Sequence, residues 1–214
     1  MKKILLFIFV SLFAININAT DYKYFNINIP DNFELKEQKD NIYEWVLKEN
    51  NHNTLVITIA GNDGSKNNIS KYTDENIKKY KEYIQNEYDK ALKEYNLKIE
   101  INNLKKEKVN DMDALVYDIT WPTKDSIGYN TYQKGITFTT SKYVYVYAWT
   151  QDTPIDINNE TYKNILASLK LNDEVIKDKG LLNTEGKRII FVGTIAGIIG
   201  YIISALKRRK VKKV

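Results

Sequence analysis

The sequence contains no cysteine. This absence excludes a disulfide framework, a thiolate zinc site and a thiol nucleophile. Histidine is almost as scarce, since His52 is the only one in the chain. A lone histidine in a polar turn between predicted strands is usually a solvated loop residue, and no Gly-x-Ser-x-Gly segment accompanies it. The residues therefore do not indicate a nucleophilic hydrolase, and we expect no cofactor.

Acidic residues are missing from both ends of the chain, because all 27 lie between Asp21 and Glu185. Residues 21–186 hold 22 lysines and no arginine, so this part has a net charge of −5 although the whole chain carries +5. The basic side chains that raise the pI thus belong mainly to the ends. A basic pI without a basic patch on the folded part does not indicate nucleic-acid binding, and we expect no nucleic-acid partner.

Residues 1–19 have the pattern of a signal peptide. Lys2 and Lys3 precede the apolar run Ile4–Ala14, which is too short to span a bilayer. Ala19 then supplies a small residue for cleavage. We therefore predict export with cleavage after Ala19, and retention of the uncleaved segment is the alternative.

A second apolar run, Ile189–Leu206, contains 18 residues without a charge. As a helix it would be about 27 Å long, close to the thickness of the hydrocarbon core of a bilayer. Residues 207–214 follow with six basic side chains, which is a strong signal for a cytoplasmic flank. The sequence thus predicts a single-pass cell-membrane protein with its domain outside, a polar linker at 172–188 and a cytoplasmic C-terminus.

Small residues recur within the predicted transmembrane helix. Gly193 and Gly197 are four residues apart, and Ala196 and Gly200 repeat this spacing one residue out of phase. Such a face lets two membrane helices approach closely and would support a homodimer. Glycine is common in membrane helices for other reasons, so a monomeric anchor remains the alternative.

Residues 20–171 form the predicted extracytoplasmic domain. The predicted strands are Tyr22–Ile29, Asn41–Lys48, Thr54–Ala60, Lys98–Glu107, Met112–Trp121, Asn130–Thr140 and Lys142–Thr150. Apolar residues at helical spacing predict a long helix over Thr73–Tyr95 and a short one over Glu160–Leu169. Short links between successive strands favour an antiparallel sheet. A sheet covered by a long and a short helix is an α+β domain.

Several segments together carry a family resemblance. They are an opening strand that stops at Pro30, a turn and strand over Asn110–Asp118, a final hairpin, and the closing segment Ile165–Leu171. This layout resembles the Mog1/PsbP-like fold of exported PsbP-related bacterial proteins. The family usually has glycine in the middle turn, where Asn110 or Asp111 stands here. The resemblance implies a non-enzymatic binding or assembly factor.

Four aromatic residues occupy alternate positions in the last predicted strand: Tyr143, Tyr145, Tyr147 and Trp149. Alternate residues share one face of a sheet, so the row could bind a sugar, a lipid or a peptide. The preferred interpretation is that a helix covers the row as part of the core.

Asp111 and Asp113 could hold a hard cation, but aspartates are equally expected in a turn without one. Our leading prediction is a membrane-anchored binding or envelope-assembly module whose partner is an envelope protein or a small ligand. The alternatives are an enzyme or weak metal-binding protein that uses Asp111, Asp113 or Asp118, and a structural oligomer driven by the transmembrane helix.

Overall fold

The computed structural model describes residues 20–172, apart from 40, 63–67, 94–97 and 122–130. The predicted signal peptide, the predicted transmembrane helix with its small residues, and the basic tail lie outside the described residues. Within the described part of the chain, no helix is long and apolar enough to cross a membrane.

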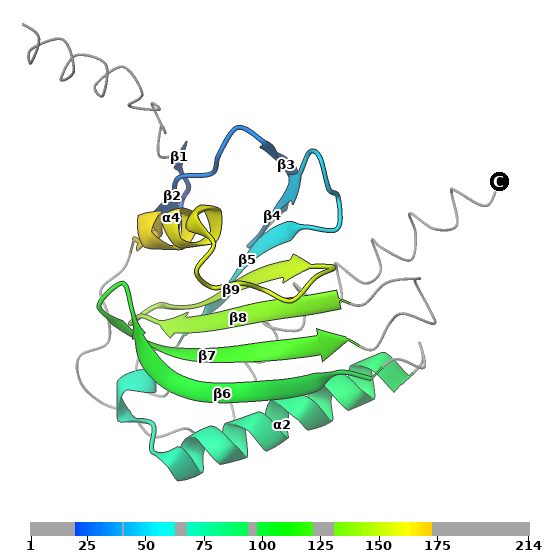
Figure 1. Ribbon diagram of the computed structural model, residues 1–214. Coiled ribbons are helices and arrows are strands. Elements are labelled where there is room, and N and C mark those ends of the chain that lie inside the picture. Colours follow the sequence, from blue (N-terminus) through cyan, green and yellow to red (C-terminus); the bar gives the residue numbers. More distant parts are fainter. Residues whose placement is uncertain (1–19, 40, 63–67, 94–97, 122–130, 173–214) are drawn as a thin grey trace, which may run out of the picture.

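Seven strands form one antiparallel sheet in the order β3-β4-β5-β9-β8-β7-β6 (Figure 1). Their bounds are β3 Phe33–Lys39, β4 Ile42–Leu47, β5 Thr54–Gly61, β6 Glu100–Val109, β7 Met112–Trp121, β8 Thr131–Thr139 and β9 Tyr143–Gln151. β9 is the central strand with β5 beside it, and each alternates side chains between the two faces of the sheet. The predicted α+β fold with a large antiparallel sheet is confirmed.

A second, small sheet joins the two ends of the domain. It consists of β1 (Thr20–Asp21), β2 (Phe25–Ile27) and β10 (Lys170–Leu171), with β2 in the middle. Asn172 fastens the end of the described domain to its start, because its backbone N–H donates to the Tyr24 carbonyl at 3.0 Å. The first and last described residues of the domain therefore lie close together.

Helices cover the two faces of the seven-stranded sheet. Helix α2 (Asp74–Leu92) lies under the half that contains β6 and β7, and α4 (Glu160–Ser168) lies on the opposite face with the small sheet (Figure 1). The side chain of Thr73 caps α2 by accepting a hydrogen bond from the backbone N–H of Asn76. The predicted apolar face of α2 is buried at Tyr80, Ile84 and Tyr88.

The β6–β7 hairpin turns at Asn110 and Asp111, whose φ angles are 49° and 63°. Two successive residues with positive φ give the type I′ turn that matches the twist of a hairpin. Both residues therefore stand where glycine would be easiest to place. The Asn110 side chain also donates to the Leu166 carbonyl at 2.7 Å and to the Leu169 carbonyl at 3.3 Å. The turn thus caps the C-terminal end of α4.

The sequence pattern misses β1, β3 and β10, and the prediction of a single sheet is wrong. Of the predicted strand Tyr22–Ile29, only Phe25–Ile27 forms a strand, β2, and β1 precedes the predicted range. β3 is an edge strand with mostly charged and exposed side chains, and it pairs with β4 through the backbone. Charge on an edge strand prevents pairing with other chains, but it removes the apolar alternation by which a strand is recognised.

Candidate functional site

The aromatic row of β9 faces α4 and the small sheet. Tyr145, Tyr147 and Trp149 are buried, whereas Tyr143 at the start of the strand is half-buried. The ring of Tyr162 from α4 lies 6.4 Å from that of Tyr147 and 5.6 Å from that of Trp149, edge-on to both. Most of the row therefore belongs to the core, and only its two ends come near the surface.

A pocket of about 320 Å³ opens at the Trp149 end of the row. It is lined by Asn32, Phe33, Leu47, Asn53, Trp149, Gln151, Thr153, Pro154, Asp156, Asn159, Thr161 and Tyr162. These residues come from the starts of β3, β5 and α4, from the ends of β4 and β9, and from the segment between β9 and α4. The lining combines three buried aromatic side chains with several amide and hydroxyl side chains.

Hydrogen bonds fix one wall of the pocket. The indole N–H of Trp149 donates to Oε1 of Gln151 at 3.0 Å. The amide nitrogen of Gln151 in turn donates to Oγ1 of Thr153 at 3.2 Å and to the carbonyl of Pro154 at 3.0 Å. Gln151 therefore orients the indole and holds the segment that leads to α4, which pre-organises the wall.

Two polar groups on the wall, on Asn53 and Tyr162, have unusual surroundings. The Oδ1 atom of Asn53 is buried and accepts no hydrogen bond from the described residues. A buried acceptor without a donor is unfavourable, so the wall is incompletely satisfied at this position. Burial raises the pKa of Tyr162, and the negative charges of Asp118 and Glu107 raise it further. The Tyr162 phenol therefore stays protonated and able to donate at ordinary pH.

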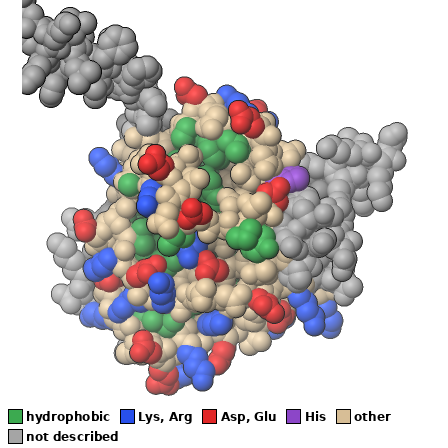
Figure 2. All heavy atoms as spheres, viewed as in Figure 1, with side chains coloured by type: hydrophobic (Ala, Val, Ile, Leu, Met, Phe, Trp, Pro, Cys, Tyr) green, Lys and Arg blue, Asp and Glu red, His purple; other side chains and the backbone are tan. Residues whose placement is uncertain are grey.

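The single histidine lies beside this wall without lining the pocket. Nδ1 of His52 is 3.0 Å from Oδ2 of Asp152, and the histidine is the purple side chain of Figure 2. His52 directly precedes Asn53 in the sequence, and Asp152 directly follows Gln151. The pair links the β4–β5 turn to the end of β9, so its evident role is to hold the two segments that carry Asn53 and Gln151.

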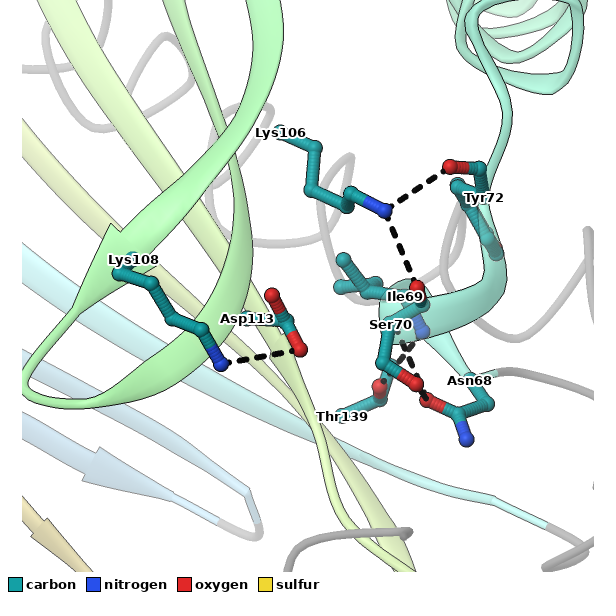
Figure 3. Close-up of polar contacts among 8 residues, drawn as sticks. All are labelled: Asn68, Ile69, Ser70, Tyr72, Lys106, Lys108, Asp113 and Thr139. Atoms are coloured by element: carbon teal, nitrogen blue, oxygen red, sulfur yellow. Dashed lines mark hydrogen bonds and ion pairs between the residues drawn. The ribbon is translucent and has the colours of Figure 1, made fainter. Parts of the chain in front are cut away.

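The three aspartates of the alternative enzyme hypothesis do not converge. Asp111 is exposed in the turn, and Asp113 lies 3.2 Å from the ammonium of Lys108 (Figure 3). Asp118 lies 2.7 Å from Nζ of Lys134. Asp113 and Asp118 are five positions apart in one strand and so point to opposite faces. Among the described residues, no group of three or more His, Asp or Glu side chains is arranged to hold a metal ion.

A second cavity, of about 460 Å³, lies between α2 and β6 and has four lysines in its lining. A bulge in β6 between Asn102 and Lys105 turns Leu104 and Lys106 toward α2. Nζ of Lys106 then donates to the carbonyls of Ser70 and Tyr72, at 3.0 Å each (Figure 3). These bonds hold the short helix η2 (Ile69–Lys71) against β6, so this lysine already has a structural role.

The site depends on residues that the sequence pattern does not single out. Asn53, Gln151 and Thr161 come from three separate segments and belong to no local motif. Trp149 is the one predicted site residue that reaches the pocket. Its position in the alternating pattern of β9 indicates the correct face, but not that the row ends at a cavity.

The sequence matches no protein-family model, and no curated protein is detectably similar to it.

The structure is similar to that of cyanobacterial PsbP (CyanoP) from Synechocystis sp. PCC 6803. The TM-score is 0.51 at 11% identity, over 74% of this chain and 95% of that one. A protein from Bacteroides thetaiotaomicron VPI-5482 aligns with a TM-score of 0.44 at 14% identity, over 70% of this chain. The aligned part is 46% of the Bacteroides chain, so this chain spans less than half of its length. The domain therefore has a PsbP-like fold, as the layout of its segments predicts.

Proposed function

We propose that this protein is a binding module tethered to the non-cytoplasmic side of the cell membrane, and that the pocket beside Trp149 holds its ligand. The observation that carries the proposal is the composition of that pocket, whose lining combines amide and hydroxyl side chains with buried aromatic rings. A PsbP-like fold supports a non-catalytic binding or assembly role. The predicted signal peptide and anchor support the location.

The lining favours an uncharged ligand with many polar groups. Among the described residues that line the pocket, Asp156 is the only carboxylate and none is a lysine or an arginine. Amide side chains both donate and accept hydrogen bonds, and hydroxyls do the same. A volume of about 320 Å³ admits a sugar unit or a short segment of peptide. We propose a neutral glycan segment as the ligand, with a peptide segment of an envelope protein as the competing outcome of the test.

The carboxylates support binding better than catalysis. Asp113 and Asp118 each lie against a lysine, and they point to opposite faces of β7. A general acid and base that share one substrate must instead converge on it. The observed arrangement therefore favours the binding module over the carboxylate-dependent enzyme.

The binding proposal is tested by titrating the full-length protein with neutral cell-wall glycan fragments and, separately, with neutral peptides. Binding can be followed by the intrinsic tryptophan fluorescence, since Trp149 lines the pocket. Saturable binding of glycans with weaker binding of peptides is the expected result. Binding of peptides alone would redirect the proposal to a protein partner, and binding of neither would contradict it.

A matched pair of substitutions on α4 locates the binding site. Thr161→Ala removes a hydroxyl from the pocket, whereas Asn164→Ala changes an exposed residue one turn further along α4. Both lie on the outside of the helix, so both should leave the fold unchanged. We expect Thr161→Ala to weaken binding by roughly tenfold, as for the loss of one hydrogen bond. Equal affinities for the two variants would place the ligand elsewhere.

The tether has its own test. Protease added to intact spheroplasts should digest the domain and leave the predicted cytoplasmic tail protected. Survival of the whole domain would contradict the proposed orientation, and complete release of the protein into the medium would contradict the anchor.

A further inference from the structure

We propose that the end of the domain that carries Tyr24 and Tyr143 rests against the membrane surface, so that the pocket beside Trp149 faces away from it. This inference rests on the tether of the proposed function and adds an orientation to it. The partner is a lipid surface, and the contact is made by aromatic rings and lysines at the level of the head groups.

Both ends of the domain leave from this place. β1 and β10 flank β2, and the side-chain amide of Asn172 donates to the Tyr22 carbonyl at 3.0 Å. Residues 172–188 then lead to the predicted span. The sequence predicts a polar linker there, and a flexible linker of that length would have a mean end-to-end distance of about 23 Å. The surface around Asn172 is therefore the part of the domain that the tether brings most often to the membrane.

The side chains at this end suit an interface between water and lipid. Tyr24 and Tyr143 are half-buried, and their rings meet edge-on at 5.0 Å between centroids. Nζ of Lys23 lies 4.8 Å from the centroid of the Tyr24 ring. Tyrosine has an apolar ring with a polar tip, and lysine has an apolar stem with a charged end, so both favour the head-group region. Lys23 and Lys170 are exposed and can approach anionic lipids.

The tyrosine pair is held by the core and is not free to turn inward. The hydroxyl of Tyr145 donates to the Tyr24 carbonyl at 3.0 Å, which fixes the backbone of Tyr24 over β9. The ring of Tyr143 also lies 6.1 Å from that of Tyr145, again edge-on. The exposed parts of Tyr24 and Tyr143 therefore form a rigid surface.

The strand that carries the aromatic row also sets the direction of the pocket. Tyr143 and Trp149 are six residues apart in β9, which corresponds to about 20 Å along a strand. Helix α2 lies on the opposite face of the sheet (Figure 1). If the tyrosine end meets the lipid, the pocket opens some distance away, toward the envelope.

The absence of cysteine from the chain makes the orientation directly measurable. Single cysteines introduced as Lys23→Cys, Thr153→Cys and Lys79→Cys would carry a fluorescent label at the tyrosine end, at the pocket rim and on α2. All three positions are exposed. The full chain is reconstituted into vesicles of phosphatidylcholine and phosphatidylglycerol that contain a head-group nitroxide lipid. We expect the nitroxide to quench the label at position 23 several-fold more strongly than the other two.

The outcomes separate the orientation from the tether. Co-flotation of the protein with the vesicles, but equal quenching at the three positions, overturns the orientation alone. Failure to co-float overturns the tether and the orientation with it. In the Lys23→Cys background, Tyr24→Ser with Tyr143→Ser should remove most of the excess quenching without changing co-flotation. Unchanged quenching in a variant with an unaltered circular dichroism spectrum would show that the rings do not make the contact.

Discussion

The two faces of the seven-stranded sheet are covered in different ways. On one face, α2 runs for 19 residues along the sheet and buries Tyr80, Ile84 and Tyr88 against β6 and β7. On the other face, α4 has only nine residues, and α4 and the small sheet cover the core together. A short cover leaves the two ends of the aromatic row near the surface. The pocket forms at one end and the tyrosine pair at the other, so the candidate functions gather on the less completely covered face.

The largest expected effect concerns the buried tyrosine phenols, which occur on both faces of the sheet. Burial raises the pKa of Tyr72 and Tyr88 on the α2 face and of Tyr147 and Tyr162 on the α4 face. Below about pH 10 these phenols are neutral in both states. Above about pH 10 the unfolded chain loses its phenol protons, while the folded chain keeps them on the buried tyrosines. The free energy of unfolding should therefore fall by about 1.4 kcal/mol per pH unit for each tyrosine.

Urea unfolding between pH 8 and pH 12, followed by tryptophan fluorescence, measures this loss. Tyrosinate absorbance recorded in parallel should rise fully only when the protein unfolds. Complete ionisation of the tyrosines in a protein that remains folded would show that solvent reaches them more easily than the structure indicates.

The close packing of the α2 face is tested next, at Gly135 in β8. A Cβ atom at Gly135 would overlap the ring of Tyr117, which crosses from the neighbouring strand. Gly135→Ala should therefore lower the free energy of unfolding by about 3 kcal/mol, as overpacking does. Gly61→Ala is the matched control, since a Cβ there would contact nothing within 4 Å. Similar stabilities for the two variants in urea titration would mean that Tyr117 moves aside at little cost.

The attachment of α4 should show a smaller effect. Asn110→Ala removes the hydrogen bonds to the Leu166 and Leu169 carbonyls and leaves a positive φ that alanine adopts with difficulty. We expect a loss of about 2 kcal/mol. Asn110→Gly loses the same bonds but accepts the φ angle, so it should cost less. If the glycine variant is the less stable of the two, the backbone conformation is not the cause.

The smallest effect is expected at the centre of the aromatic row. The Tyr147 hydroxyl is buried and has no hydrogen-bond partner among the described residues. Tyr147→Phe removes an unsatisfied group and keeps the ring, so stability should change by less than about 1 kcal/mol, in the favourable direction. A clear loss of stability in thermal melts would instead reveal a partner for the hydroxyl. Glycan binding should be unaffected, since this residue does not line the pocket.

Residues with a strong periodic pattern predicted their own structure well. The apolar stripe of α2 and the alternation of β9 both place the expected residues in the core, because burial of one face is what each pattern reflects. Prediction failed for β3, whose charged side chains suit an exposed edge and hide the strand. It also failed for β1 and β10, which are two residues long and exist only because β2 lies between them.

The sequence by itself determined the α+β class, the PsbP-like layout, the long helix and the face of the sheet on which the aromatic row lies. These follow from local periodicity and from the order of segments along the chain. Only the tertiary structure decided that Trp149 lines a pocket, that Asp113 and Asp118 diverge, and that the two ends of the described domain lie together beside Tyr24. Each of these depends on strand register and on contacts between segments far apart in sequence. Such contacts leave no periodic signal in any one segment, so they become visible only when the sheet is assembled.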